Sequence, residues 1–288
     1  MNFRFPMLLL VLLAGALLCV AARAQPVQPV EAAAGQILIG GSGSSITALQ
    51  LAGQAFKAAH PHASIVLLPG LGSNGGLNAL RAGAIDLAVM GRPLKDAERH
   101  PDIVAAEYGR TPLVFATGLR TRPMALSLPG LVRIYSGETT AWPDGSPLRL
   151  VLRSQFSPET ELLKGLSPAM AQAVQAARER PGMRVTYDDR LNADTLEKIP
   201  GTLGTVTLAQ IIAEKRTLQA LSIDGVAPSV AALMQGTYPY AKPLVLVSRA
   251  QATPLVQQFV AFLRSAPGRA ILEANGHWVG PQGKAGTP

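Results

Sequence analysis

Three short stretches rich in glycine and serine could bind an anion, and each lies between a predicted strand and a predicted helix. The first covers residues 40–45 and has the sequence GGSGSS. Glycine lets the backbone approach a ligand closely, and the free N–H groups at a helix N-terminus attract negative charge. The hydroxyls of Ser44 and Ser45 could add hydrogen-bond donors. By itself, the same sequence is equally compatible with a simple helix cap.

The second stretch, residues 69–76 with the sequence PGLGSNGG, repeats this chemistry after the next predicted strand. Ser73 offers a hydroxyl, and Asn74 and Gly75 lie where the following helix should begin. Loops of successive β–α units meet at the carboxyl edge of a parallel sheet, where the ligands of open α/β sheets bind. Two adjacent loops of this kind therefore predict an anion site more specifically than either loop alone.

The third stretch, residues 153–158 with the sequence RSQFSP, also follows an apolar strand. Arg153 offers a planar fork of donors that matches an oxyanion, and Ser157 is placed to cap the helix that Pro158 begins. Arg92 follows another predicted strand and would lie at the same sheet edge. The alternative for Arg153 is an exposed arginine at a strand end, but the accompanying serine and helix start favour a binding role.

Apolar segments typical of strands alternate with helical patterns along most of the chain. The opening order of strand, helix, strand, helix and strand predicts an α/β fold with a mostly parallel sheet and helices on both faces. The predicted strands cover residues 36–40, 64–68, 86–90, 112–117, 148–152, 184–187, 203–207, 217–223 and 244–248. The predicted helices cover residues 45–59, 75–82, 128–136, 158–164, 168–178, 254–264 and 267–274.

The N-terminus has the parts of a cleavable signal peptide. Arg4 gives a basic start, residues 8–20 form an apolar run, and Ala22-Arg23-Ala24 is a small-x-small cleavage site. We therefore expect residues 1–24 to be removed and the mature protein to be periplasmic. Cys19, the single cysteine, would leave with the signal peptide, so no disulfide is expected. The residue before Cys19 is not small, which disfavours a lipid anchor.

The composition of the mature chain favours anions but not nucleic acid. Its net charge falls from +8 to +6, because the signal peptide carries two arginines and no acidic residue. The basic residues are scattered and aromatic residues make up only 5%, so neither a basic stripe nor a stacking platform is expected. Residues 25–35 are interpreted as a flexible leader and residues 281–288 as a disordered tail.

The sequence predicts a binding protein rather than an enzyme. It contains no Gly-x-Ser-x-Gly nucleophile elbow, and the mature chain would have no cysteine nucleophile. The four histidines, His60, His62, His100 and His277, lack the spacing of metal ligands. We therefore expect no metal, no cofactor and no catalytic residue.

Taken together, these segments resemble the phosphate-binding periplasmic proteins of phosphate ABC importers, which have the type II periplasmic binding-protein fold. The resemblance runs with gaps from Ile37 to Trp278 and includes the first two loops, residues 86–94, residues 134–142 and residues 238–247. Arg153 and Ser157 match the Arg-x-x-x-Ser start of the family's third anion loop. The ligand-binding residues that we predict are Ser44, Ser45, Ile46, Ser73, Asn74, Gly75, Arg92, Arg153 and Ser157.

The resemblance implies two lobes that close on a small oxyanion, most simply phosphate, and deliver it to an importer permease. The expected lobes are residues 36–116 with 225–280, and residues 117–224, in a monomer. This chain has Gly91 where family members place an aspartate that accepts the proton of phosphate, and Pro158-Glu159 where they have Gly-Thr. These departures keep open a binding module for sensing, envelope assembly or adhesion, with another small ligand or none.

Overall fold

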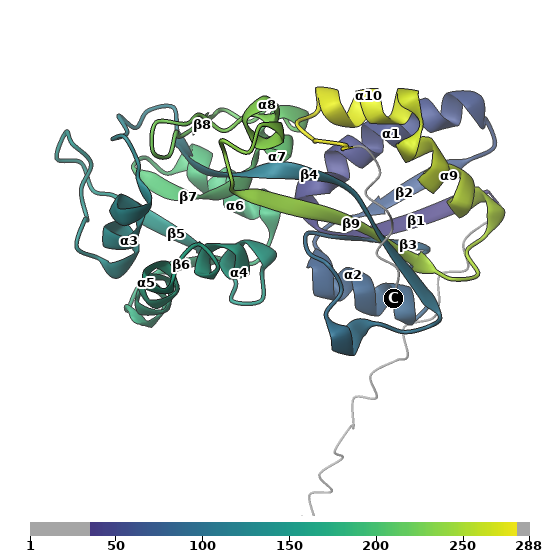
Figure 1. Ribbon diagram of the computed structural model, residues 1–288, viewed down its shortest axis with the longest axis horizontal. Coiled ribbons are helices and arrows are strands. Elements are labelled where there is room, and N and C mark those ends of the chain that lie inside the picture. The colour runs from purple at the N-terminus through teal and green to yellow at the C-terminus, as the bar shows by residue number, and fades with distance from the viewer. Residues whose placement is uncertain (1–34, 281–288) are drawn as a thin grey trace, which may run out of the picture.

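The computed structural model describes residues 35–280, which form two lobes side by side (Figure 1). The expected signal peptide, the leader up to residue 34 and the C-terminal tail lie outside the described residues. Within residues 35–280, no helix is long and apolar enough to cross a membrane. The expected α/β fold with two lobes is confirmed.

One sheet runs through both lobes in the order β2-β1-β3-β9-β4-β7-β5-β6, and β8 pairs with β4 outside this path. Neighbouring strands are parallel at both ends of the sheet and antiparallel around β4 and β9. The strands are β1 (Gln36–Gly41), β2 (Ser64–Leu68), β3 (Leu87–Met90), β4 (Ile103–Gly118), β5 (Arg149–Arg153), β6 (Arg184–Thr186), β7 (Thr202–Thr207), β8 (Leu218–Ala220) and β9 (Ala241–Arg249).

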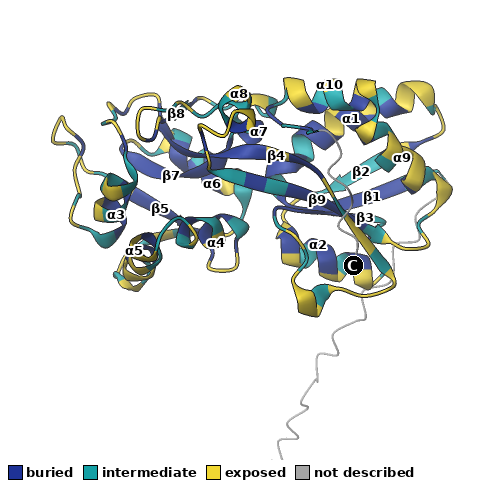
Figure 2. Ribbon diagram, viewed as in Figure 1, coloured by how far each residue is buried: buried dark blue, intermediate teal, exposed yellow. Residues whose placement is uncertain are grey.

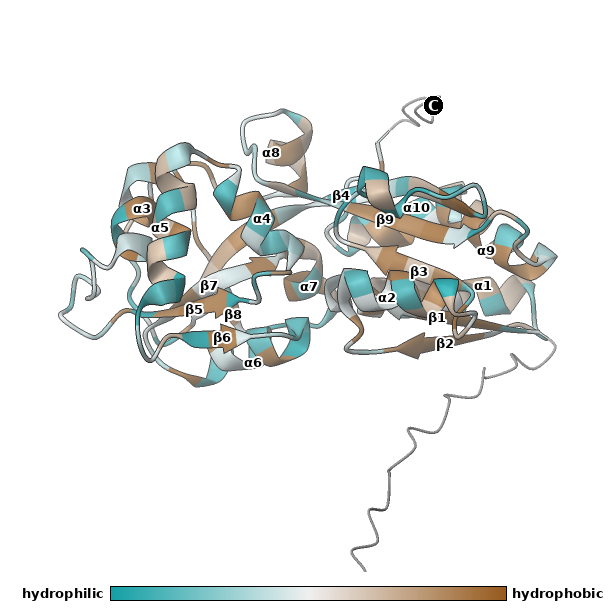
Figure 3. Ribbon diagram, turned by 90° about the horizontal axis from the view of Figure 1, so that it is seen from below, coloured by the Kyte–Doolittle hydropathy of each residue, from teal (hydrophilic) through white to brown (hydrophobic). Residues whose placement is uncertain are grey.

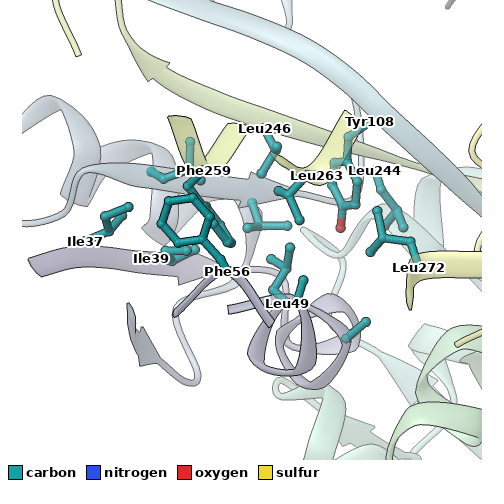
Figure 4. Close-up of a cluster of buried hydrophobic side chains, with 14 of the residues drawn as sticks. Ile37, Ile39, Leu49, Phe56, Tyr108, Leu244, Leu246, Phe259, Leu263 and Leu272 are labelled. Atoms are coloured by element: carbon teal, nitrogen blue, oxygen red, sulfur yellow. The ribbon is translucent and has the colours of Figure 1, made fainter. Parts of the chain in front are cut away.

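The first lobe packs helices on both faces of β1, β2 and β3 (Figure 1). Alternate residues of a strand point to opposite faces, so Ile37 and Ile39 join one apolar cluster while Leu38 joins another. Figure 4 shows the larger cluster, in which Phe56 and Phe259 pack edge to face. The helices of this lobe are α1 (Ile46–Ala59), α2 (Gly72–Arg81), α9 (Pro254–Arg264) and α10 (Ala266–Ala274).

The second lobe repeats this arrangement around β5, β6 and β7. Leu150 and Leu152 pack into one apolar cluster, and Val151 packs into another on the opposite face. Figure 3 shows the hydrophobic strands of both lobes lying between helices. The helices of this lobe are α3 (Leu128–Ser136), α4 (Pro158–Lys164), α5 (Pro168–Glu179), α6 (Asp189–Lys198), α7 (Leu208–Ala213) and α8 (Val230–Met234).

Two long antiparallel strands, β4 and β9, connect the lobes and are largely buried where they cross (Figure 2). The expected strand at 112–117 is only the end of β4, which begins at Ile103 because its first half pairs with β9. Three helices were not expected, α6, α7 and α8, and α2 begins three residues earlier than predicted. Short or polar helices of this kind carry a weak periodic signal.

Candidate functional site

A pocket of about 140 Å³ lies between the lobes at the carboxyl ends of β1, β5 and β6. Its buried part is polar, and its mouth is formed by exposed residues of loops from both lobes. The residues that line it are Ser42, Gly43, Gly70, Leu71, Gly72, Ser73, Asn74, Arg153, Ser154, Phe156, Ser157, Pro158, Glu159, Tyr187, Asp188, Asp189 and Lys242.

The first loop leaves β1 through a turn that only glycine allows. Gly41 has a φ of 135°, and a Cβ there would lie 2.0 Å from the carbonyl oxygen of Val89. The next residue, Ser42, donates its N–H to that same oxygen at 2.8 Å. Residues 43–45 then form a 3₁₀ turn ahead of α1. The loop is thus fixed against β3, with Ser42 and Gly43 facing the pocket.

The second loop packs directly on the first. A Cβ at Gly76 would lie 2.8 Å from the Cα of Gly41, so this contact also requires glycine. The buried hydroxyl oxygen of Ser73 accepts a hydrogen bond from the N–H of Gly91 at 3.0 Å. That bond fixes the oxygen of Ser73 at the pocket wall while its O–H hydrogen stays available as a donor.

Arg153 is buried at the second lobe's side of the pocket rather than exposed at a strand end. Its guanidinium donates to the carbonyl oxygen of Asp188 at 2.8 Å and to Oδ1 of Asp189 at 2.5 Å. The other carboxylate oxygen of Asp189 accepts the N–H of Ser44, in the first lobe, at 2.8 Å. The carboxylate of Asp189 therefore joins the two lobes by taking one donor from each.

A second carboxylate of the pocket, that of Glu159, is buried. Glu159 pairs with the ammonium of Lys242, accepts a hydrogen bond from Ser157 Oγ at 2.7 Å and lies 4.0 Å from Nε of Arg153. Burial alone would raise the pKa of Glu159, but the charges of Lys242 and Arg153 and the hydrogen bonds outweigh it and lower the pKa to about 2. The carboxylate is therefore ionised at neutral pH.

Lys242 is fully buried and enters the pocket from the crossing strand β9. Besides Glu159, its ammonium donates to Ser42 Oγ at 3.2 Å and to Ser44 Oγ at 3.0 Å. A Cβ at residue 91 would lie 2.2 Å from Cε of Lys242, so the lysine fills the space beside Gly91. Gly91, which departs from the family pattern, is therefore the residue that leaves room for the side chain of Lys242.

The predicted ligand-binding residues fall into three groups. Ser73, Asn74, Arg153 and Ser157 line the pocket. Ser44 does not line it but bonds to two residues that do, Lys242 and Asp189. The remaining residues, Ser45, Ile46, Gly75 and Arg92, are outside the pocket lining.

Arg92 bonds to Glu98 and Asn74 instead of lining the pocket. It forms a two-pronged ion pair with Glu98 at 2.6 and 2.7 Å and donates to Oδ1 of Asn74 at 2.6 Å. Its side chain also borders a different cavity of about 360 Å³, lined mainly by apolar residues. The ion pair lowers the pKa of Glu98, against the opposing effect of burial.

Sequence reasoning missed the residues that carry most of the charge in the pocket, namely Lys242, Glu159, Asp188 and Asp189. One signal was available for Lys242, since it is the one charged residue inside the apolar stretch of residues 238–248. The two aspartates lie two and three residues after the end of β6, at the same sheet edge as Arg153. Among residues 35–280, no group of three His, Cys, Asp or Glu side chains is arranged to hold a metal ion.

Known proteins share both the sequence pattern and this fold. The family model of the PBP superfamily domain matches residues 26–267. The phosphate-binding protein PstS of Bacillus subtilis is 27% identical over 248 residues, which is 82% of this chain and 77% of PstS.

Solved structures extend the likeness to the fold. One from Clostridium perfringens, described as a candidate phosphate ABC transporter substrate-binding protein with bound phosphate, superposes with a TM-score of 0.74 at 18% identity. That match covers 85% of this chain and all of the other. An ABC-type phosphate transport receptor from Vibrio cholerae gives 0.61 at 18% identity, with the same coverage of both chains. With the family model matched over most of its length, this chain belongs to the PBP superfamily.

Proposed function

We propose that this protein binds a small oxyanion, phosphate above all, in the pocket between its lobes and delivers it to an ABC-type permease. The observation that carries the proposal is the buried guanidinium of Arg153, which faces the hydroxyl- and glycine-rich loops of the first lobe across the pocket. Guanidinium groups, hydroxyls and loop N–H groups are the donors that oxyanions prefer.

The present partners of these donors support the same chemistry. Arg153 and the N–H of Ser44 both bond to the carboxylate of Asp189, and Ser157 bonds to that of Glu159. Each carboxylate is itself an oxyanion group. The donors are therefore already arranged for negatively charged oxygen atoms, and the names of the relatives suggest phosphate as the free ligand.

The cellular setting belongs to the same proposal. It comprises secretion to the periplasm by residues 1–24, a monomer, a membrane permease as partner, and no catalytic activity. The lobes that would close on the ligand are those expected from the sequence, residues 36–116 with 225–280 and residues 117–224, except that α8 is assigned to the second lobe, because Ala232 packs against the apolar cluster of that lobe. Four apolar clusters, two around each end of the sheet, support a division into two lobes, although Phe115 and Tyr238 pack in a cluster of the second lobe.

Isothermal titration of the purified mature protein tests the proposal. Phosphate, arsenate, sulfate and molybdate should be titrated separately at fixed ionic strength. We expect saturable heat with phosphate at one site per chain. Absence of heat with all four anions would refute oxyanion binding.

A second candidate is a binding module for sensing, envelope assembly or adhesion, with a different ligand or none. It is favoured by Glu159 and Asp189, because these carboxylates already occupy the donors that a free anion would need. The titration distinguishes the two candidates. Capture of a stable envelope partner by a protein that gives no heat with any oxyanion would favour the second.

A further inference from the structure

Two exposed aromatic side chains stand at the mouth of the pocket. Phe156 is 71% exposed and Tyr187 is 77% exposed, and both line the pocket. Among residues 35–280, no other Phe, Tyr or Trp side chain is exposed. Large aromatic groups are usually buried, so the occurrence of both exceptions at one pocket points to a role there.

The strands bring these two rings to the same place. β5 and β6 are parallel neighbours, and Arg153 at the end of β5 is paired in register with Thr186 at the end of β6. Tyr187 directly follows Thr186, and Phe156 comes three residues after Arg153. Both rings therefore belong to the loops that surround the guanidinium of Arg153, which donates to Thr186 Oγ1 at 3.2 Å.

The floor and the mouth of the pocket differ in chemistry. The floor is buried and polar, with Arg153, Ser157 and Lys242. The mouth carries Phe156 and Tyr187, and the half-buried Leu71 lines it from the first lobe. A ligand that consists only of an inorganic anion has groups for the floor but none for the apolar mouth. Small-molecule sites in general combine apolar walls with a few placed polar groups.

We propose that the preferred ligand is a phosphate monoester whose substituent is a planar aromatic or heteroaromatic ring. The phosphate group would take the donors of the floor, and the ring would pack against Phe156 and Tyr187 at the mouth. This inference rests on the proposed oxyanion function and specifies the class of ligand for the same pocket. No covalent step is involved, because the ester is bound intact.

The test compares inorganic phosphate, methyl phosphate and phenyl phosphate by isothermal titration at one pH and ionic strength. Phenyl phosphate should bind about tenfold more tightly than inorganic phosphate, whereas methyl phosphate, which lacks the ring, should bind like inorganic phosphate. A tenfold difference is about 1.4 kcal/mol, within the range expected for packing one ring on aromatic neighbours.

The double variant F156A/Y187A should remove the preference for phenyl phosphate, so that phenyl phosphate and inorganic phosphate bind to this variant with Kd values within about twofold of each other. Leu191→Ala is the matched control, since Leu191 is also an exposed apolar residue of this lobe but does not line the pocket. It should keep the preference. Both rings are exposed, so the double variant is expected to fold.

Two results would overturn the inference, and they can be told apart from failure of the oxyanion site. If inorganic phosphate binds at least as tightly as phenyl phosphate, or if the double variant keeps the preference, the ring subsite is wrong while the oxyanion site stands. If no phosphate compound gives heat, the oxyanion proposal fails and the ring subsite fails with it.

Discussion

The two lobes face the same pocket with different chemistry. The first lobe presents neutral groups, the backbone of two glycine-rich loops and the hydroxyls of Ser42 and Ser73. The second lobe presents the charges of Arg153, Glu159 and Asp189. Lys242, from the crossing strand β9, adds one more charge between them.

The first lobe supplies donors at fixed positions, and the second lobe supplies charge. The glycines of the first lobe hold backbone groups at fixed positions that no change of protonation can alter. Arg153 of the second lobe and Lys242 of β9 are each paired with an acid of the chain itself, so a ligand must compete with a tethered carboxylate. We therefore expect substitutions on the charged side to have larger effects than substitutions on the neutral side.

The largest effect is expected from Glu159→Gln, which breaks the buried pair with Lys242. The variant leaves the ammonium without a counter-charge, and loss of one partner of a buried pair costs about 3–5 kcal/mol. The free energy of unfolding from urea denaturation should fall by that amount. Glu161→Gln, an exposed acid in the same helix α4, is the control and should change it by less than about 0.5 kcal/mol. Equal stability of the two variants would show that the pair contributes little.

The next effect concerns binding rather than folding. Arg153→Ala should weaken phosphate binding by about 2–5 kcal/mol, the cost of truncating one member of a buried charge pair. In a titration this corresponds to an increase in Kd of roughly 30-fold or more. Arg184→Ala, an exposed arginine on β6, should leave Kd unchanged. An unaltered Kd in Arg153→Ala would remove this residue from the site.

Acid should affect the lobes at different pH values, and His277 is the sensitive group of the first lobe. Burial lowers the pKa of His277 to about 4, against hydrogen bonds to Asn275 and Leu272 that oppose the shift. Between about pH 6.5 and 4, His277 is protonated in the unfolded chain but stays neutral in the folded chain. The free energy of unfolding should therefore decrease as the pH falls through this window, by up to about 3 kcal/mol.

The carboxylate of Glu159 in the second lobe also loses its stabilising contribution as the pH falls, but in a lower pH range. Its folded pKa of about 2 lies below the usual 4.5, so its contribution is complete above pH 4.5 and is lost only between 4.5 and 2. Urea denaturation at several pH values separates the two groups. His277→Gln should flatten the slope above pH 4.5, whereas His62→Gln, at an exposed position, should not. A slope that persists in His277→Gln would assign it to another group.

A smaller effect, and a gain, is expected from Asp189→Asn. The amide keeps the size of the carboxylate but removes the charge that competes for Arg153. Phosphate should then bind about tenfold more tightly, because Arg153 no longer has to give up its charged partner to bind the ligand. A hydrogen bond to a charged group contributes about 1.5 kcal/mol. Asp194→Asn, in the same helix but paired with Arg216, is the control. Weaker binding by Asp189→Asn would mean that this carboxylate supports the ligand instead of competing with it.

The sequence predicted those elements whose signals are local. Helices α3, α4 and α9 begin and end at the predicted residues, because Ser127, Ser157 and Thr253 cap them and proline occupies the first turn. The first half of β4 was missed, since it is a strand only through pairing with β9, more than a hundred residues away. A pattern of neighbouring residues cannot indicate pairing with a strand so distant in the sequence.

The residues of the candidate site also divide into those with a local sequence signal and those placed by long-range packing. Glycine and serine at the start of a helix are recognisable in sequence, so Ser73 and Ser157 were found among the residues that line the pocket. Lys242 and Asp189 reach it only because β9 crosses between the lobes and because β6 lies beside β5. Arg92 follows a strand in the expected way, but its ion pair with Glu98 depends on side-chain geometry that no spacing reveals.

The smallest effect on binding belongs to the neutral side of the pocket. Ser73→Ala removes one uncharged donor, and a hydrogen bond of this kind contributes about 1 kcal/mol, so phosphate binding should weaken by about fivefold. The variant also leaves the N–H of Gly91 without its acceptor, so the free energy of unfolding should fall by about 1–3 kcal/mol. Ser64→Ala, an exposed serine at the start of β2, controls for serine loss as such and should change neither quantity. A loss in Ser73→Ala as large as that in Arg153→Ala would mean that the neutral lobe, rather than the charged one, dominates anion binding.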